Sequence, residues 1–182
     1  MLETYRLLLK NITPEYEYLN HVFSEKTDSE IQLEFGLELI EFQKLKLRVQ
    51  GGLETHSVTV NYFLMIEKLT NRVIGECGYH NLNKLHHKAE LFYAMRSDEF
   101  KKQGFMSEAV PVVIGYGFNN LNLHRIEVKV APLNTPSVRI IEKNGFIKEG
   151  FLREDYLIND KYENSEIYSM LKSEYPNNMD VD

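Results

Sequence analysis

The chain has 182 residues, of which 43% are hydrophobic and 26% are charged, and its formal net charge at pH 7 is -6. This balance is typical of one folded globular domain and argues against a disordered chain. The negative charge argues against broad electrostatic binding to nucleic acid or to anionic membranes, so any anion site must be local.

Cysteine usage and the first residues bear on the compartment. A single cysteine, Cys77, excludes an internal disulfide framework and fits a reducing cytosol, so we expect a cytoplasmic protein. The opening Met1–Arg6 lacks the basic region and apolar run of a secretion signal. No segment contains the ~20 consecutive apolar residues of a membrane-spanning helix. We expect a soluble chain without a targeting segment.

The N-terminal part predicts a strand followed by a helix. Tyr5–Lys10 is strand-like. Thr13 can cap a helix, and Pro14 suits the first helical position. Apolar residues then recur at helical spacing as far as Phe23, which predicts the first helix.

A second helix is predicted after a new cap. Thr27–Ser29 offers capping side chains, and Glu30–Val49 is rich in Leu, Glu and Lys. We predict one longer helix over this segment despite Gly36. Gly51–Gly52 is expected to end it.

Three consecutive antiparallel strands are predicted next. Residues alternate between apolar and polar over Val58–Ile66, and Leu69–Arg72 has the composition of a turn. Strand character resumes over Val73–His80 and, after the polar loop Asn81–Lys88, over Ala89–Met95. Loops this short favour antiparallel pairing.

The apolar period then changes to that of a helix. Gly104–Asn120 carries apolar residues at spacings of three and four, which predicts an amphipathic helix that Pro111 bends. Ile126–Val130 alternates as a strand, and a short helix over Ser137–Asn144 is expected to stop at Gly145.

The last two predicted strands are Phe146–Arg153 and Glu166–Leu171. The predicted order is β α α β β β α β α β β, with a strand-helix-strand crossover in the middle. This order indicates an α+β fold, and residues 1–182 are expected to form one domain. The polar end Pro176–Asp182 is expected to fray.

The stretch Phe100–Ala109 lies between a predicted strand and the long amphipathic helix. The unpaired amides at the start of a helix and the positive end of its dipole favour a phosphate, and Gly104 would allow close approach of the backbone. Lys101 and Lys102 add local positive charge. The alternative is a solvated loop with an ordinary turn, because the stretch lacks the spacing of a Walker loop or of a dinucleotide fingerprint.

A second stretch makes a specific resemblance visible. Asn134–Phe146, taken with Gln103–Ala109, resembles the GNAT acetyltransferase superfamily, and within it the ribosomal-protein N-terminal (serine/alanine) acetyltransferase-like branch. Thr4–Leu9 and Asn159–Tyr168 are also similar to that branch. The resemblance implies an acetyl-CoA-dependent N-acetyltransferase. Its fold would be a mixed, mostly antiparallel sheet of about seven strands with helices on both faces.

The resemblance also implies where coenzyme A binds. The family's first motif is glutamine or arginine, two residues, glycine, one residue, then glycine or alanine. Lys101 takes its first place and Met106 its last. Because backbone amides suffice for a diphosphate, these departures put little in doubt. The implied coenzyme-binding residues are Ala94, Met95 and Arg96 along the pantetheine arm; Lys101, Lys102, Gln103, Gly104, Phe105, Met106 and Ser107 around the diphosphate; Asn134 through its amide; and Lys143.

The reaction needs a neutral amine, a stabilised oxyanion and a leaving thiolate. A backbone amide near Phe92–Met95 could stabilise the oxyanion. Ser137 or Tyr156 could donate a proton to the thiolate, whose pKa is about 8.5. Asn134 and Ser137 also have local alternatives, since Asn-Thr-Pro favours a turn and serine caps helices.

The general base is less determined. In some relatives a glutamate acts as the general base beside such a serine. The position of that glutamate is occupied by Tyr156 in this chain, so this base is not carried over. Glu90 is our candidate catalytic carboxylate, with Glu76 and His80 as substitutes by composition. A solvent-facing strand residue is the alternative for each of them.

A zinc site is also considered. His80, His86, His87 and Cys77 match no paired-ligand pattern, so we expect no metal.

The acceptor is expected to be a protein or peptide N-terminus. An α-amine titrates near 7.7–8.0 and lysine near 10.4, so deprotonation costs the α-amine about 3 kcal/mol less and a weak base suffices. The alternatives are a small amine (polyamine, amino acid or antibiotic) or a noncatalytic acyl-CoA-binding sensor. The oligomeric state stays open, a homo-oligomer included.

Overall fold

The computed structural model describes residues 1–11, 22–23, 25–36, 38–40, 42–44, 46 and 59–176. Most of the predicted first helix from Thr13 and Pro14, the predicted helix end at Gly51–Gly52 and nearly all of the predicted frayed tail lie outside these residues. The last two residues of that predicted helix, Val22 and Phe23, are described and are helical. Within the described part, no helix is long and apolar enough to cross a membrane.

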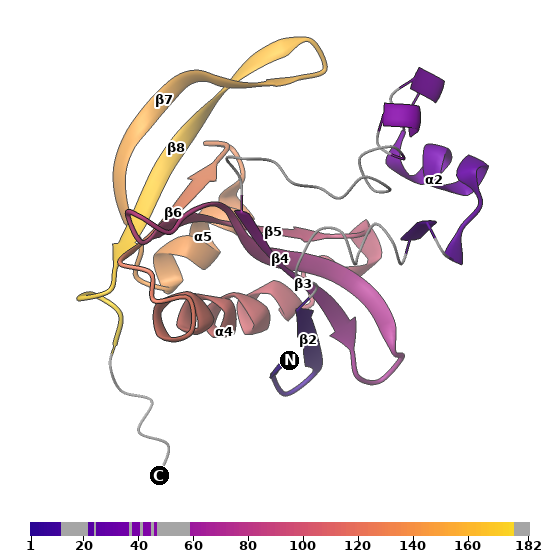
Figure 1. Ribbon diagram of the computed structural model, residues 1–182. Helices are drawn as coiled ribbons and strands as arrows, with labels where there is room; N and C mark the ends of the chain where they lie inside the picture. The colour runs from indigo at the N-terminus through magenta and orange to yellow at the C-terminus, as the bar shows by residue number, and fades with distance from the viewer. Residues whose placement is uncertain are drawn as a thin grey trace.

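The described strands form one eight-stranded sheet in the order β1-β2-β3-β4-β5-β6-β8-β7 (Figure 1). Neighbouring strands are antiparallel except β5 and β6, which are parallel. The strands are β1 Leu2–Glu3, β2 Leu7–Asn11, β3 Thr59–Glu67, β4 Arg72–Asn83, β5 Lys88–Met95, β6 Arg125–Val130, β7 Ile147–Ile158 and β8 Lys161–Leu171. The predicted mixed, mostly antiparallel sheet is therefore confirmed, and the two-residue β1 is the strand that the prediction missed.

Helices cover the sheet on two sides. The described helices are α2 Asp28–Phe35, the 3-10 helix η1 Asp98–Phe100, α4 Phe105–Asn119 and α5 Thr135–Lys143. Figure 1 shows α4 and α5 along one face of the sheet, whereas α2 lies beyond the other. The β7–β8 hairpin rises away from the rest of the sheet, and its tip points toward the segment that carries α2.

The helix predicted over Glu30–Val49 is interrupted at Gly36, because α2 ends there and the described residues 39–40, 42–44 and 46 are helical again. Thr27 caps α2 reciprocally, since its hydroxyl accepts from the Glu30 amide and the Glu30 carboxylate accepts from the Thr27 amide at 2.8 Å. The prediction that the helix continues through Gly36 is wrong. Gly36 adopts the left-handed conformation with φ 64° and donates its N–H to Gln32, which ends α2.

The last hairpin is longer than predicted. β7 runs beyond Arg153 to Ile158. An irregularity between Leu152 and Tyr156 interrupts its pairing with β8, and the pairing resumes at Tyr156. The turn Asn159–Asp160 has positive φ at both residues, 48° and 59°, as a tight hairpin turn of the primed type requires.

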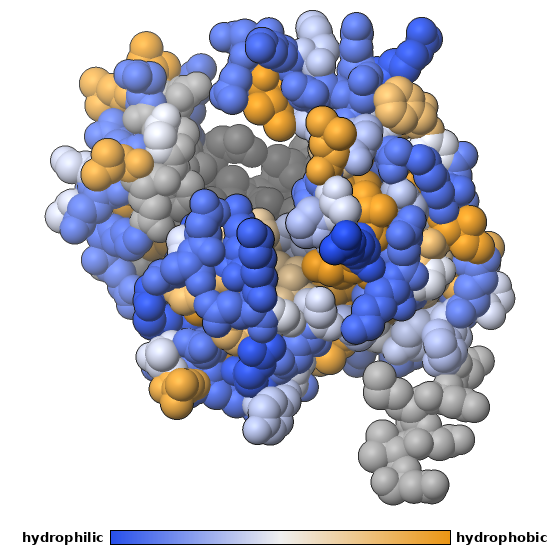
Figure 2. Space-filling view, turned by 180° about the vertical axis from the view of Figure 1, so that it is seen from behind, coloured by the Kyte–Doolittle hydropathy of each residue, from blue (hydrophilic) through white to orange (hydrophobic). Residues whose placement is uncertain are grey.

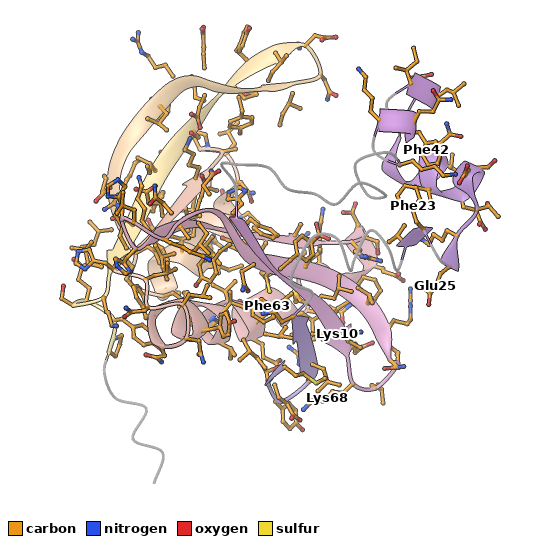
Figure 3. The ribbon with its side chains drawn as sticks, viewed as in Figure 1. Lys10, Phe23, Glu25, Phe42, Phe63 and Lys68 are labelled. Atoms are coloured by element: carbon orange, nitrogen blue, oxygen red, sulfur yellow. The ribbon has the colours of Figure 1, made fainter. Side chains whose placement is uncertain are left out.

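The main core lies between the sheet and α4. The apolar stripe predicted for this helix is buried against strands β2 to β6. Phe63 of β3 points toward α4 (Figure 3) and packs edge-on against Tyr116, with 5.1 Å between ring centroids. Pro111 lies inside the helix, which continues as one element.

A second, small core belongs to the segment that carries α2. Phe23 and Phe42 stack with ring centroids 5.8 Å apart (Figure 3), and Val22 and Ile31 are buried with them. This cluster is separate from the main core.

Gly117 allows the sheet and α4 to approach closely. The buried Tyr79 hydroxyl donates to the Val113 carbonyl at 2.7 Å, and a Cβ on Gly117 would overlap that hydroxyl and lie 2.7 Å from Tyr79 Cζ. Gly117→Ala is therefore expected to lower the free energy of unfolding by about 2 kcal/mol and the melting temperature by about 4–8 °C. Gly115→Ala is the control, because a Cβ there would approach only the hydroxyl end of the partly buried Tyr175, at 2.8 Å, and would lie 3.8 Å from its Cζ. Equal melting temperatures for the two variants would contradict the prediction.

Candidate active site

The sheet opens between β5 and β6. These parallel strands pair only at Lys88 with Arg125, Ala89 with Ile126 and Glu90 with Glu127. Beyond this point β5 continues beside β4, and β6 continues beside β8. One edge of β5 after Glu90 is therefore not paired with its neighbour, as an extended ligand would need.

The predicted pantetheine-binding residues lie on this edge or just after it. Ala94 and Met95 are the last residues of β5, paired with Glu76 and Gly75 of β4. The Arg96 amide donates to the Ile74 carbonyl at 3.0 Å, so that amide is already used by β4. Binding of the pantetheine arm to this edge stays a prediction.

The turn before α4 presents backbone amides. Gly104 is the N-cap residue in the left-handed conformation, with φ 80°, and no described side chain caps the helix. The first-turn amides of Phe105, Met106 and Ser107 have no acceptor within the helix, whereas Glu108 N donates to Gly104 O at 3.1 Å. The buried side chains of Phe105 and Met106 anchor this turn to the core. The arrangement suits an anion such as a diphosphate.

Side chains of the preceding loop are mostly engaged locally. Lys101 Nζ lies 2.5 Å from Asp98 Oδ1, and this contact lowers the pKa of Asp98. Gln103 Nε2 donates to Glu99 O at 2.6 Å. Lys102 is exposed and has a left-handed backbone, φ 62°. The loop's anion-binding potential therefore resides mainly in its backbone.

Lys143 and Asn134, two of the predicted coenzyme ligands, lie at opposite ends of α5. Lys143 is exposed in the last turn of the helix, whereas Asn134 caps the first turn. A role for Lys143 in binding coenzyme A stays a prediction.

Arg6 is a component of the site that the sequence analysis missed. Its Nη1 donates to Gln103 O at 3.0 Å, and its Nε donates to Glu108 Oε2 at 2.8 Å. The guanidinium carbon lies 4.4 Å from the centre of the Phe105 ring. No local pattern links position 6 to position 104, so only the tertiary fold reveals this contact.

The structure shows whether Asn134 or Ser137 caps α5, which the sequence left open. Asn134 Oδ1 accepts from the Ser137 amide at 3.3 Å, so Asn134 is the cap. The alternative that Ser137 caps the helix is wrong, because Ser137 lies within the first turn. Its hydroxyl instead lies 2.6 Å from the hydroxyl of Tyr93, a residue of β5.

Tyr93 is the second component that the sequence analysis missed. Burial raises the pKa of its phenol, and the bond to Ser137 offsets this only in part, so Tyr93 stays protonated at neutral pH. Tyr156, the other predicted proton donor, lies close to the end of β7, opposite Glu163. Within the described part of the chain, no hydrogen bond joins Tyr156 to Ser137, so the structure does not bring the two predicted hydroxyls together.

The opposite face of β4 and β5 carries a carboxylate and aromatic rings. His80 and Glu90 are cross-strand partners, and Asn81 Nδ2 donates to Glu90 at 3.1 Å. His80 Nε2 lies 3.2 Å from Glu90 Oε1 but outside hydrogen-bonding geometry, which leaves this buried nitrogen without a partner among the described residues. Phe92 lies between the rings of Tyr62 and His80, with centroid distances of 5.2 and 5.5 Å.

Glu90 is ionised at neutral pH. Burial raises its pKa, but the contacts with His80 and Asn81 and the charge of Lys129 outweigh burial, so the pKa lies below its usual value. Glu76, the substitute base, shares this face by strand alternation but pairs with Ala94, four residues farther along β5.

Neighbouring carboxylates already have basic partners. Glu127 lies 2.7 Å from Arg125 Nε, and Arg125 also binds Glu149, whose pKa this contact lowers to about 2. Asp155 lies 3.1 Å from Lys129 Nζ. Neither Glu90 nor the substitute Glu76 has an ion pair to a Lys or Arg within 4.0 Å among the described residues, and Glu90 is the one of the two that lies where β5 and β6 part.

Cys77 and His80 do not share a site. Cys77 is buried on the α4 face of β4, whereas His80 points to the opposite face. The described residues contain no group of three or more His, Cys, Asp or Glu side chains suited to a metal.

Seen from behind, the surface is hollowed between the β7–β8 hairpin and the segment that carries α2 (Figure 2).

Comparison with known proteins gives a family match over most of the chain. Residues 6–147 match the family described as the acetyltransferase (GNAT) domain. An uncharacterized N-acetyltransferase, YoaA, of Bacillus subtilis is 32% identical over 174 residues, which cover 94% of this chain and 97% of that protein. The ribosomal-protein-serine acetyltransferase of Escherichia coli is 26% identical over 123 residues, 68% of each chain.

A third similarity is to a polyamine-modifying enzyme. The spermidine N(1)-acetyltransferase of Vibrio cholerae is 31% identical over 113 residues, which cover 62% of this chain and 65% of that protein. A solved structure of spermidine N-acetyltransferase from Vibrio cholerae superposes with a TM-score of 0.70 at 24% identity, covering 94% of this chain and 98% of that one. The structural similarity confirms the predicted fold.

Proposed function

Because the chain belongs to the GNAT acetyltransferase family, and is therefore an N-acetyltransferase that uses acetyl-CoA, we propose that its acceptor is the α-amine at the N-terminus of a protein or peptide. In this proposal the diphosphate binds the amides around Gly104 and the pantetheine arm extends along the unpaired edge of β5. The thioester then lies where β5 and β6 part, between Glu90 and the pair formed by Ser137 and Tyr93.

The proposed chemistry is direct transfer. The neutral amine attacks the thioester carbon, the nitrogen–carbon bond forms and the carbon–sulfur bond breaks. Glu90 binds the ammonium form of the acceptor and accepts its proton, directly or through water. The sulfur receives a proton from Ser137, which Tyr93 replenishes through their 2.6 Å contact, and Tyr93 regains its proton from solvent. The second proton that the nitrogen loses as the amide forms passes to solvent, so an acceptor that starts as an ammonium releases one proton overall.

The charge pattern supports an acceptor with one cationic amine. Among the residues that the structure describes, Glu90 at the opening is not bound to Lys or Arg, whereas Glu127, Glu149 and Asp155 are each paired with Arg125 or Lys129. A polycation would gain most from several unpaired carboxylates. The position of Glu90 at this opening, beside His80 and without an ion pair to Lys or Arg, is the observation that carries the proposal.

Spermidine is the second candidate acceptor, because spermidine acetyltransferases are among the similar proteins. Peptides with N-terminal serine or alanine, the same peptides with blocked N-termini and an internal lysine, and spermidine should be compared at saturating acetyl-CoA. We expect kcat/KM for the free N-termini to exceed that for spermidine at least about 10-fold, with mass spectrometry locating the acetyl group on the α-nitrogen. A preference for spermidine would overturn the proposal. Tight acetyl-CoA binding without thiol release from any amine would indicate a sensor.

The role of Glu90 gives a further prediction. Glu90→Gln should lower kcat/KM for the peptide about 10- to 100-fold, the value of a hydrogen bond to an ammonium group, and leave KM for acetyl-CoA unchanged. Since the pKa of Glu90 lies below its usual value, the rise of the wild-type rate near neutral pH should follow the pKa of the acceptor amine. Glu127→Gln is the matched control, as Arg125 and Lys88 already neutralise that carboxylate. Equal losses in the two variants would count against a specific role for Glu90.

A further inference from the structure

We propose that Arg6 is a positioning residue for the coenzyme site, because it orients the turn before α4 so that its amides face the diphosphate. The inference rests on the proposed function, which places the diphosphate at this turn. Arg6 lies in the bend just before β2, almost a hundred residues from the turn it contacts.

Three contacts fix the guanidinium. Nη1 donates to Gln103 O at 3.0 Å, Nε donates to Glu108 Oε2 at 2.8 Å, and the planar group covers the Phe105 ring at 4.4 Å. Nη2 would lie 3.5 Å from a Cβ at Gly104. Arg6 thus contacts three groups around the turn. These are the carbonyl of Gln103, the ring of Phe105 at the start of α4 and the carboxylate of Glu108 in its first turn.

Because a peptide group is planar, the contact of Arg6 with the Gln103 carbonyl also fixes the direction of the Gly104 amide. In a trans peptide the C=O and the following N–H point in opposite directions. When Arg6 holds Gln103 O, the Gly104 N–H is directed away from Arg6. That amide is one of the donors proposed for the diphosphate, so loss of the contact would let the peptide rotate.

Arg6 also balances the charge of Glu108. A carboxylate in the first turn of α4 would repel a diphosphate bound there. Glu108 is held by the hydroxyl of Thr4, the Arg6 amide at 2.6 Å and the Arg6 side chain, and these contacts lower its pKa despite partial burial. The carboxylate is therefore ionised, and the guanidinium neutralises it beside the anion site.

The test compares acetyl donors with and without the diphosphate. Arg6→Met should raise the Kd of coenzyme A and KM for acetyl-CoA about 10- to 100-fold, with kcat at saturation changed less than about threefold. The same loss is expected with acetyl-dephospho-CoA, which keeps the diphosphate. With S-acetylpantetheine, which lacks it, kcat/KM should match that of the wild type. Arg72→Met is the matched control, since Arg72 pairs with Glu99 and stacks on Phe100 without contacting Gln103.

Each outcome has one meaning. If the wild type does not bind coenzyme A, the proposed function fails, whatever Arg6 does. If the wild type binds and Arg6→Met binds equally well, only this inference fails. An equal loss with S-acetylpantetheine would assign Arg6 a purely structural role. Should Arg6→Met fold poorly, Arg6→Lys provides the test: it keeps the charge but cannot span both Gln103 and Glu108, and it should show the same dependence on the diphosphate.

Discussion

Gly104→Glu is expected to weaken coenzyme A binding at least about 100-fold, measured by calorimetry. The new carboxylate would lie at the start of α4, where the unpaired amides and the helix dipole otherwise favour a diphosphate. It would also reach Arg6, whose Nη2 lies 3.5 Å from the position of the new Cβ, and so compete with the phosphate for positive charge. The turn is exposed and offers room, so the fold should survive.

Two further variants separate the contributions to this loss. Gly104→Ala adds only the strain of a side chain at φ 80°, about 1–2 kcal/mol, and should lower stability more than affinity. Gly104→Gln matches the size of glutamate without its charge, so its loss of affinity should fall between the two. Wild-type affinity in a folded Gly104→Glu variant would remove the diphosphate from this turn and with it the proposed coenzyme site.

Local patterns predicted most of the sheet and the long helix. The hairpin from Thr59 to Asn83 and strand β5 follow from alternation and polar turns, and α4 follows from its apolar spacing. The turn at Gly104 was predicted as an anion site because a glycine between a strand and a helix leaves the first helical amides open to a ligand. In each case the determining residues lie within one element or at its end.

Predictions failed where a single residue had two local meanings. A glycine such as Gly36 can be tolerated inside a helix or can end one. The structure shows that Gly36 ends α2, because it adopts the left-handed conformation. The pairing of β7 beyond Arg153 depends on the irregular residues before Tyr156, which destroy the alternation that would signal a strand.

Long-range contacts account for the parts of the site that were missed. Arg6 meets Gln103 because the bend before β2 lies against the N-terminus of α4, and Tyr93 meets Ser137 because β5 lies against the N-terminus of α5. Neither partner carries a signal at its own position. Arginine in a strand opening and tyrosine in a half-buried strand are both ordinary, so only the fold identifies these two as parts of a site.

Ser137→Ala is expected to lower kcat about 100-fold with little change in KM for acetyl-CoA, the loss associated with a missing general acid. Without the hydroxyl, the departing thiolate must take its proton from solvent. Tyr93→Phe should lower kcat less, about 10-fold, because serine remains in place and loses only its 2.6 Å partner. Tyr162→Phe, on an exposed tyrosine of the hairpin, is the matched control and should leave kcat unchanged.

The order of these effects follows from the proposed relay. Ser137 donates to the sulfur, and Tyr93, which stays protonated because burial raises the pKa of its phenol, returns a proton to Ser137 through their 2.6 Å contact. A larger loss in Tyr93→Phe than in Ser137→Ala would reverse the assignment and make the phenol the direct donor. Tyr156→Phe tests the remaining hydroxyl: a fall in kcat there, with wild-type rates in both other variants, would move the acid to the hairpin. Because β7 carries Tyr156 close to the hairpin tip while Ser137 lies at the start of α5, that result would require the hairpin to close over the opening during the reaction.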